Sequence, residues 1–572
     1  MHAQFETMVH CVRHRAAHQP ERLAIYHLPE LREVADALSY AELDRRARAV
    51  AARLQARVRP GGRVLLVMMN HPDYVVGLLG CWYARCVGVN LLPPSREKHL
   101  ERLSLVAQDC SAEALLTSGA ASALLQQRLH LSPALAPLHW IRVDEVQAQH
   151  AEDWQAQAPE PEALALLQYT SGSTGQPRGV MLRHGHIALH CEAMRRGWGF
   201  TEADHTVSWL PLYHDMGLFL GPMVSLYTGF PIGLSDPLTF VKHPDRWLRQ
   251  ISERRATFSG GPNFCYDLCV DVVDPAGLDG VDLSAWNRAL NGAEPVRTST
   301  IQRFQAAFGP LGFGAQTMRP AYGLAEAILV VAVTPPGTPM VQRDVDPERL
   351  QEGVVAPPGD GGARRLTSSG QPNPGTELRI VDPEAHRALE PLRVGEIWIR
   401  SVAGASGYWN QAEASANTFD VSLAGEAPGW LRTGDLGFLD EQGYLYVTGR
   451  RKDLLILHGR NHYPQDLEET AENASDSIRQ NFVAAFAAEV DGRERVVVVA
   501  EVRRDAPPDL DLERAGRSVM RRVLDEHQIR VDEVVLVQHG QIPKTTSGKV
   551  QRALTQTLWR AHDLTTLATV TR

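Results

Sequence analysis

The sequence contains very little lysine. Only five of its 58 basic residues are lysines, and arginine supplies the others. The formal net charge is −9, so a broad basic face of the kind that binds nucleic acid is not expected. A coding bias toward arginine explains most of this composition, but it makes the position of each remaining lysine informative. The lysines are Lys98, Lys242, Lys452, Lys544 and Lys549.

Paired cysteines and uninterrupted apolar runs are also missing. The seven cysteines all precede residue 271 and form no Cys-x-x-Cys pair, which is typical of reduced thiols. The first 20 residues lack the apolar segment of a secretory signal. The stretch 216–235 is uncharged and long enough to cross a bilayer, but four glycines and two prolines interrupt it. We therefore expect no membrane span and a cytoplasmic location.

The length of 572 residues exceeds what one hydrophobic core organises, so at least two domains are expected. Hydrophobic residues make up 44% and charged residues 22% of the chain, which excludes disordered, collagen-like and coiled-coil classes. From about residue 20 to 330, short apolar strands alternate with helix-like stretches, as in a strand at 63–69 followed by a helix at 71–85. This alternation predicts two α/β lobes with mostly parallel sheets.

The pattern changes after residue 376. Shorter strands of period 2 between 377 and 448 predict a small β-rich lobe. A further unit follows, with strands at 495–502 and 533–538 around an amphipathic helix at 512–529, whereas 353–375, rich in glycine and proline, is predicted to be irregular. The expected fold class is α/β: a large N-terminal domain at 1–450 and a small α+β C-terminal domain at 451–572.

The strongest local signal is Leu-Gln-Tyr-Thr-Ser-Gly-Ser-Thr-Gly-Gln-Pro-Arg-Gly at 167–179, after an apolar strand at 163–169 and before a predicted helix at 183–196. Glycines let the backbone fold around an anion, hydroxyls and amides donate to phosphate oxygens, and Arg178 adds positive charge. It is not a Walker A loop, because no Gly-x-x-x-x-Gly-Lys-Ser/Thr occurs in the chain. By itself this segment could equally be a solvated Ser/Gly turn.

Five further motifs follow in order. They are Trp-Leu-Pro-Leu-Tyr-His-Asp-Met-Gly at 209–217, Asn-Gly-Ala-Glu-Pro at 291–295, Tyr-Gly-Leu-Ala-Glu-Ala at 322–327, Thr-Gly-Asp at 433–435 with Gly-Arg at 449–450, and Pro-Lys-Thr-Thr-Ser-Gly-Lys at 543–549. Over almost its whole length the chain thus resembles the acyl-adenylate-forming superfamily, and most of all its fatty-acyl-AMP ligases. The resemblance implies that ATP, with Mg²⁺, activates a fatty acid to acyl-AMP and pyrophosphate.

The resemblance also implies the nucleotide-binding residues. Thr170 to Gly175 would hold the β- and γ-phosphates with Arg178, where most members carry lysine. Tyr322 would stack on adenine, Asp435 would accept hydrogen bonds from the ribose hydroxyls, and Glu326 would bind Mg²⁺. The complete ATP-binding set is Thr170, Ser171, Gly172, Ser173, Thr174, Gly175, Arg178, Gly292, Ala293, Glu294, Tyr322, Gly323, Asp435 and Arg450.

Two residues are the expected catalytic groups. Lys549 is a compact, flexible ammonium that could bridge the substrate carboxylate and the α-phosphate as negative charge gathers there. His214 would lie at the mouth of the acyl pocket. Lys452 matches the hinge about which the C-terminal domain swings in the family. The alternative interpretations are a structural histidine and two surface lysines in turns.

The branches of the superfamily differ in the molecule that accepts the acyl group. Segments 259–269 and 458–466 resemble the fatty-acyl-AMP ligases, as does an insertion at about 346–365, whose Leu350, Val354 and Val355 could pack on the N-terminal domain. In that branch the insertion hampers CoA access, so the acceptor would be the phosphopantetheine thiol of a separate acyl carrier protein. The alternatives are a fatty acyl-CoA synthetase and a catalytically silent adenylate-binding protein. The sequence fixes neither the acyl chain length nor the carrier.

Overall fold

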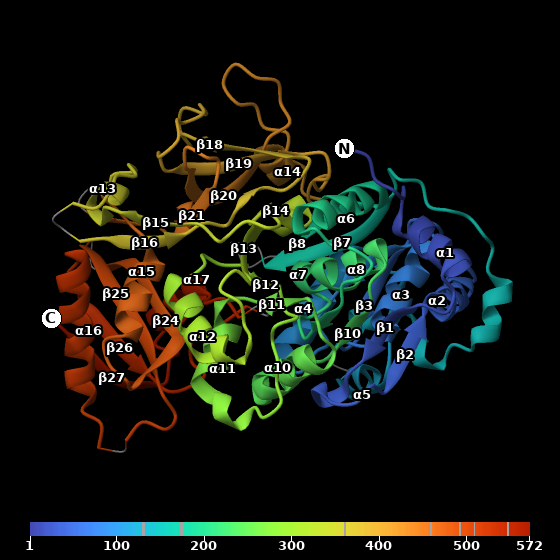
Figure 1. Cartoon of the computed structure of the whole chain (residues 1–572), viewed down its shortest axis with the longest axis horizontal. Helices are drawn as coiled ribbons and strands as arrows, with labels where there is room; N and C mark the ends of the chain where they lie inside the picture. The colour runs from blue at the N-terminus through green and yellow to red at the C-terminus, as the bar shows by residue number, and fades with distance from the viewer. Residues whose placement is uncertain are drawn as a thin grey trace.

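The computed structural model describes residues 1–128, 132–171, 177–359, 362–457, 460–490, 493–507, 509–545 and 548–572. Two large sheets occupy its first 372 residues (Figure 1). One has six strands in the order β6-β5-β3-β4-β7-β8, and the other has nine in the order β17-β14-β13-β12-β11-β9-β10-β1-β2. Most neighbours are parallel, as expected. The strands of the first sheet are β3 (Arg63–Val67), β4 (Val87–Asn90), β5 (Ala114–Thr117), β6 (His139–Arg142), β7 (Leu164–Ser171) and β8 (Pro177–Arg183).

Helices pack on both sheets and enclose their shared core. Helix α3 is buried at all of its 12 positions, which agrees with a sequence that carries no charge apart from Asp73, and it begins with Pro72 behind a His71 cap. The strands of the second sheet are β1 (Leu23–His27), β2 (Asp36–Ser39), β9 (Thr206–Ser208), β10 (Ile232–Leu234), β11 (Phe258–Gly261), β12 (Arg288–Asn291), β13 (Met318–Gly323), β14 (Val330–Val333) and β17 (Gln371–Pro372). The helices are α1 (Met8–His18), α2 (Tyr40–Gln55), α3 (Pro72–Tyr83), α4 (Glu97–Asp109), α5 (Gly119–Arg128), α6 (His184–Trp198), α7 (Asp215–Leu218), α8 (Val224–Thr228), α9 (Pro237–Lys242), α10 (Pro244–Glu253), α11 (Asn263–Val272) and α12 (Thr298–Phe308).

The uncharged stretch at 216–235 is divided among α7, a π-helical turn, α8 and β10. Gly229 ends α8 in the left-handed region, which interrupts any continuous helix. Within the described ranges, no helix is both long enough and apolar enough to cross a membrane.

An antiparallel sheet forms the predicted β-rich lobe, seen at the top of Figure 1. Its strands, in order, are β18 (Thr376–Val381), β19 (Gly395–Ser401), β20 (Leu431–Leu439) and β21 (Leu445–Arg450). Helix α14 (Ala412–Thr418) lies in the connection from β19 to β20. Fold class and lobe composition therefore follow the prediction.

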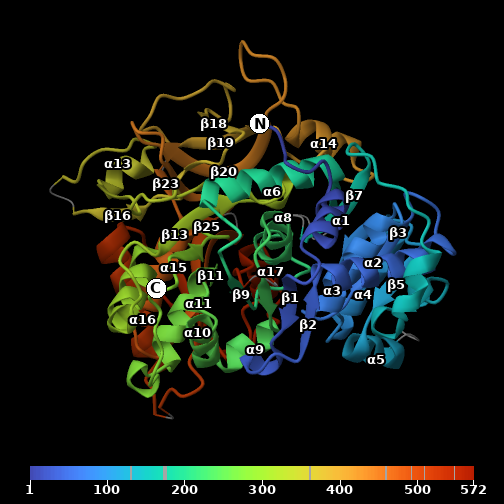
Figure 2. The same cartoon turned by 45° about the vertical axis from the view of Figure 1, so that its right-hand side comes forward.

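The residues after 450 form a further unit, orange to red at the left of Figure 1 and still beside α11 in the turned view of Figure 2. It contains a short hairpin and a mixed sheet in the order β24-β25-β26-β27, with its own apolar core. Its elements are β22 (Leu455–Leu457), β23 (Arg460–His462), α15 (Pro464–Glu472), β24 (Ile478–Val490), β25 (Arg493–Val502), α16 (Leu512–His527), β26 (Glu533–Val537), α17 (Arg552–Arg560) and β27 (Thr566–Thr571).

Helix α15 joins this unit to the preceding residues. The Arg297 guanidinium donates to Glu472 at 2.7 Å, and the Ser299 hydroxyl donates to Glu469 at 2.7 Å. Arg364 also donates to Asp466. The unit is thus held by charge-assisted hydrogen bonds, which are stronger than neutral ones. A domain boundary near 450 and a swinging motion stay predictions.

Two local predictions were incomplete. The strand at 163–169 and the helix at 183–196 that were expected to flank the phosphate-loop motif are present as β7 and α6, but strand β8, which lies between them and pairs antiparallel with β7, was not predicted. The range 353–375 was expected to be irregular, but β16 (Arg364–Thr367) pairs there with β15 (Gln342–Val345). Strands β8 and β16 are each stabilised by pairing with a neighbouring strand, although few of their residues are typical strand formers.

The insertion predicted at about 346–365 packs partly as expected. Leu350, on α13 (Pro347–Gln351), and Val355 are buried against Phe438 and Tyr446 of the β-rich lobe. Val354 is only half-buried and pairs through its backbone with Arg393. The same cluster includes Tyr463 from beyond residue 450, so the insertion contacts both parts of the chain.

Candidate active site

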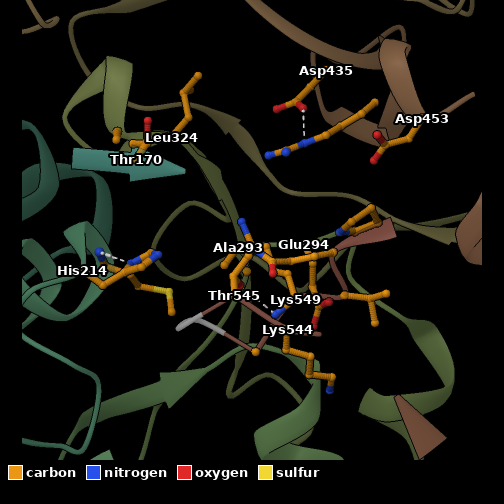
Figure 3. Close-up of a pocket in the computed structure, with 18 of the residues that line it drawn as sticks. Thr170, His214, Ala293, Glu294, Leu324, Asp435, Asp453, Lys544, Thr545 and Lys549 are labelled. Carbon is orange, nitrogen blue, oxygen red and sulfur yellow. Dashed lines mark hydrogen bonds and ion pairs between the residues drawn. The ribbon is translucent and has the colours of Figure 1, made fainter. Parts of the chain in front are cut away.

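A single cavity of about 2040 Å³ contains side chains from every part of the fold. Figure 3 shows Thr170 and His214 on one side of it, Asp435 above, and Lys544 and Lys549 below. Four of the five lysines line it, namely Lys98, Lys452, Lys544 and Lys549. Of the predicted residues, the cavity also includes Arg178, Gly292, Ala293, Glu294, Tyr322, Gly323, Glu326 and Arg450. The chain folds so that motifs up to 380 residues apart share one space.

The ends of the phosphate-loop motif lie at this cavity. Thr170 on β7 is paired directly with Arg178 on β8. Ser171 is the last residue of β7. Gly172, Ser173, Thr174 and Gly175 lie outside the described residues. The Arg178 guanidinium lies 5.4 Å from the centre of the Tyr408 ring.

Glu326 enters the cavity from a 3₁₀ turn, Ala325–Ala327, directly after β13. The chain can turn there because Gly323 has no Cβ, which would lie only 1.9 Å from the Leu329 carbonyl oxygen. The Tyr408 hydroxyl donates to Glu326 Oε1 at 2.8 Å. Burial raises the pKa of Glu326, as expected for a carboxyl removed from bulk water.

Asp435 is held from two sides. Arg450 lies opposite it in the β20–β21 register and donates from Nε to Oδ1 at 3.2 Å. The Tyr322 hydroxyl donates to Oδ2 at 2.7 Å. The Thr433 hydroxyl accepts from the Asp435 amide. Sequence analysis predicted the ring of Tyr322 as a stacking surface but not its hydroxyl as a support for Asp435.

The segment Gly292 to Glu294 follows β12 and passes along the cavity wall. Ala293 has a φ of 73°, a left-handed conformation that is uncommon outside glycine and turns the backbone sharply. Glu294 Oε1 accepts from the Asn263 amide at 3.1 Å. This carboxylate also lies in the electrostatic surroundings of both Lys544 and Lys549.

Lys549 reaches the cavity from the C-terminal unit. Its backbone amide donates to the Thr545 hydroxyl at 3.0 Å. Burial lowers the pKa of the Lys549 ammonium, and the positive charge of Arg450 lowers it further, whereas Asp215 opposes the shift. The ammonium is thus partly dehydrated, a condition in which its field acts strongly on a nearby anion.

Lys544 directly precedes Thr545 in the chain. Its ammonium lies 3.6 Å from the centre of the Phe482 ring, and the Arg479 guanidinium lies 3.4 Å from that centre. Burial lowers the pKa of Lys544 to about 8. The aromatic ring therefore supports two cations beside the loop that carries Lys549.

His214 caps α7, because its Nδ1 accepts from the Met216 amide at 3.3 Å. Burial opposes ionisation of the adjacent Asp215, but the charges of His214 and Lys549 outweigh it and hold the pKa of Asp215 below its ordinary value. The apolar side chains of Met216, Leu220, Phe264, Leu290 and Leu329 also line the cavity. An apolar lining of this kind is suited to a hydrocarbon tail.

Lys452 lies in a 3₁₀ turn, Arg451–Asp453, between β21 and β22. It lines the cavity, and burial lowers the pKa of its ammonium. Its function as a hinge stays a prediction.

Besides the Tyr322 hydroxyl, three further features of the site were not predicted. They are the contact of Tyr408 with Glu326, the aromatic support of Lys544 by Phe482, and the ion pair between Arg297 and Glu472. Each joins residues that are far apart in sequence. A tyrosine after Gly407 and a row of acidic residues on α15 were the only local signals for two of them.

Comparisons with known proteins identify the family to which the chain belongs. The AMP-binding enzyme family model matches residues 12–409, and a model described as Disco-interacting protein 2-like, AMP domain, matches residues 452–569. The medium-chain-fatty-acid–[acyl-carrier-protein] ligase JamA of Moorena producens is 39% identical over 96% of this chain and 94% of its own length. The long-chain-fatty-acid–AMP ligase FadD32 of Mycolicibacterium smegmatis is 36% identical over 90% of this chain and 88% of its own.

A solved structure is similar over the whole chain. It is the fatty acyl-adenylate ligase of Legionella pneumophila in complex with acyl adenylate and pyrophosphate, with a TM-score of 0.77 and 34% identity. The similarity covers 99% of this chain and 98% of that one. The protein therefore belongs to the AMP-binding enzyme family and, within it, to the fatty-acyl-AMP ligases, which use ATP to form acyl-AMP.

Proposed function

We propose that this ligase forms acyl-AMP through Lys549 and then passes the acyl group to the phosphopantetheine thiol of a separate carrier protein. The relative JamA is named as an acyl-carrier-protein ligase, which supports this acceptor. The observation that carries the proposal is that Lys549, Asp435 and Glu326 line one cavity, although they come from three separate parts of the fold.

In the first step, a carboxylate oxygen of the fatty acid attacks the α-phosphorus of ATP. A new P–O bond forms, the bond to the β-phosphate oxygen breaks, and pyrophosphate leaves with the electron pair. Two anions must approach each other, so positive charge has to be fixed in place beforehand. Lys549 is the cation proposed to bridge the attacking carboxylate and the α-phosphate, and His214 to orient the carboxylate.

The remaining residues are proposed to hold the nucleotide. Asp435 accepts from the ribose hydroxyls, Tyr322 and the segment Gly292 to Glu294 enclose adenine, and Arg450 lies near the ribose and phosphate. Thr170 and Arg178 contact the β- and γ-phosphates together with the loop between them. In the second step the carrier thiol attacks the acyl carbon, loses its proton, and AMP leaves.

The residues present fit Mg²⁺. No group of three His, Cys, Asp or Glu side chains within the described ranges could form an all-protein metal site, and Glu326 offers a single carboxylate. Mg²⁺ commonly takes only one or two carboxylates and completes its shell with substrate phosphates and water. When bound, the ion would supply neutralisation of the triphosphate charge.

Loss of the Lys549 ammonium tests the proposal. We expect Lys549→Ala to lower the rate of fatty-acid-dependent pyrophosphate release by roughly 100-fold or more, by analogy with removal of one oxyanion donor. Lys242→Ala is the control, because this exposed lysine lies outside the cavity. Near-normal pyrophosphate release by a folded Lys549→Ala variant would remove Lys549 from the mechanism.

The acceptor is tested by offering two thiols. The enzyme, ATP, Mg²⁺ and fatty acids of graded length are incubated with a panel of phosphopantetheinylated carrier proteins or with CoA, and products are identified by mass. We expect acyl-carrier products and little CoA ester. Efficient CoA ester formation with no carrier loaded would instead identify a fatty acyl-CoA synthetase.

A further inference from the structure

One short segment joins the two phosphate-facing groups of the cavity. The backbone of residues 405–409 hydrogen bonds to β8 on both sides of Val180, from Trp409 to the Gly179 carbonyl at 2.7 Å and from Met181 to the Gly407 carbonyl at 3.0 Å. The Ala405 amide also donates to the Glu326 carbonyl at 3.0 Å. The segment therefore links the strand that carries Arg178 to the turn that carries Glu326.

Tyr408 is the side chain of this segment that touches both groups. Its ring centre lies 5.4 Å from the Arg178 guanidinium, and its hydroxyl donates to Glu326 Oε1 at 2.8 Å. The ring is fixed, because it is only 6% exposed and packs edge-on against Phe419. Its backbone amide donates to the Ser415 hydroxyl at 2.8 Å.

We propose that Tyr408 is a positioning residue that sets Arg178 and Glu326 in one arrangement for the metal-bound triphosphate. This inference rests on the proposed function, in which these two side chains face the phosphates and Mg²⁺. The hydroxyl holds one carboxylate oxygen of Glu326, so the carboxylate keeps a fixed orientation and presents its other oxygen to the cation. Such outer contacts of metal ligands commonly change metal affinity by about 10-fold to 100-fold.

The ring has the complementary effect on Arg178. A planar guanidinium stacks on an aromatic face, whereas a lysine ammonium is a strongly hydrated point charge with other geometry. The buried Tyr408 ring can thus keep the Arg178 guanidinium oriented toward the phosphates without a carboxylate partner. The arginine at this position and the tyrosine beneath it are expected to act as a pair.

The two contacts can be separated by substitution. Tyr408→Phe keeps the ring and removes the hydroxyl, Tyr408→Leu removes both, and Arg178→Lys tests the stacked cation. The matched control is Tyr446→Phe, because Tyr446 is also a buried tyrosine whose hydroxyl approaches a carboxylate, that of Asp440, at 3.5 Å. Tyr446 does not line the cavity.

The measurement is binding without turnover. Mn²⁺ replaces Mg²⁺ as a spectroscopic probe, an ATP analogue with a methylene group between the α- and β-phosphorus is the nucleotide, and no fatty acid is added. Electron paramagnetic resonance gives the Kd of Mn²⁺ at saturating analogue, and calorimetry gives the Kd of the analogue. Thermal melting is recorded for every variant.

We expect Tyr408→Phe to raise the Kd of Mn²⁺ about 10-fold, with the Kd of the analogue within about 3-fold of the parent value. Tyr408→Leu should weaken the analogue as well, by about 5-fold, in line with loss of a cation–π contact. Arg178→Lys should weaken the analogue in the parent chain but add little in Tyr408→Leu, because the pair is already broken. Tyr446→Phe should leave both constants unchanged.

Three results would overturn the inference. The first is a Kd of Mn²⁺ in Tyr408→Phe within about 2-fold of the parent value. The second is that Arg178→Lys and Tyr408→Leu have additive effects on the binding free energy of the analogue. The third is a lower melting temperature of Tyr408→Phe with both dissociation constants unchanged. The last result would give Tyr408 a packing role only. Pyrophosphate release by the parent enzyme is measured in parallel, so failure of the proposed function is detected separately.

Discussion

The carboxylates of Glu294, Glu326 and Asp435 are each held by a donor from another segment. Asp435 receives Arg450 on one oxygen and the Tyr322 hydroxyl on the other. An ionised carboxylate has about four acceptor positions, so two of them stay available for further donors, which under the proposed function are the ribose hydroxyls of ATP. The protein donors therefore orient Asp435 without saturating it.

Asp435→Asn tests this arrangement. The asparagine side chain has the same size, but its NH₂ group replaces one acceptor oxygen. This NH₂ donor would face another donor, either the Arg450 guanidinium or the Tyr322 hydroxyl. We expect the KM for ATP to rise about 10-fold or more, with a smaller change in kcat, because ribose contacts bind substrate and transition state alike. Tyr322→Phe, which retains the ring, should raise the KM less. An unchanged KM in Asp435→Asn, measured by pyrophosphate release, would contradict a ribose contact.

At the scale of elements, the sequence predicted what is encoded locally. Strand β26 was placed within one residue of its observed bounds, and α3 and α16 within a few residues of theirs, because apolar periodicity marks one buried face. Strand β8 was missed because Pro177, Arg178 and Gly179 have the composition of a loop and are ordered by pairing with β7. The contact of Tyr408 with Glu326 was missed for the same reason, since it depends on tertiary structure alone.

The contact between β16 and α15 has a predictable pH dependence. Burial raises the pKa of Asp466 to about 6 against the opposing charge of Arg364, whereas an unfolded aspartate has a pKa of about 3.9. The folded chain therefore binds a proton that the unfolded chain lacks between about pH 4 and pH 6. Proton binding by Asp466 therefore adds to the free energy of unfolding. This contribution is complete below about pH 4 and is lost as the pH rises through about 6.

Asp466→Asn removes this titration, because the amide is uncharged at every pH. We expect the variant to melt higher than the parent at pH 7.5, by roughly 2 °C or more, and the difference to vanish at about pH 4. Asp525→Asn, an exposed position on α16, is the control and should show no such trend. A lower melting temperature of Asp466→Asn at pH 7.5 would mean that the Arg364 contact outweighs the cost of burial.

At the scale of the whole molecule, the catalytic cavity is complete only when the residues after 450 are docked. Lys544 and Lys549 enter it from that unit, whereas His214, Glu294 and Glu326 belong to the preceding residues. Under the proposed role of Lys549, docking is a condition for the first step, and the contacts that maintain the docked arrangement would act on catalysis from outside the cavity. Of these contacts, the ion pair between Arg297 and Glu472 is the most buried, since Glu472 is 2% exposed.

Glu472→Gln tests this dependence on docking. The substitution removes the carboxylate that is hydrogen-bonded to Arg297 and leaves only the charges of Glu469 and Glu294 acting on it. Loss of one partner of a buried ion pair typically costs about 3 kcal/mol or more. We expect the undocked population to grow, so that trypsin cleaves faster at Arg450 to Lys452 and pyrophosphate release slows by about 10-fold. Glu513→Gln, which breaks an exposed pair on α16, should change neither rate. If the cleavage rate rises while pyrophosphate release stays unchanged, docking of this unit does not limit the first step; if neither changes, the ion pair does not maintain the docked arrangement.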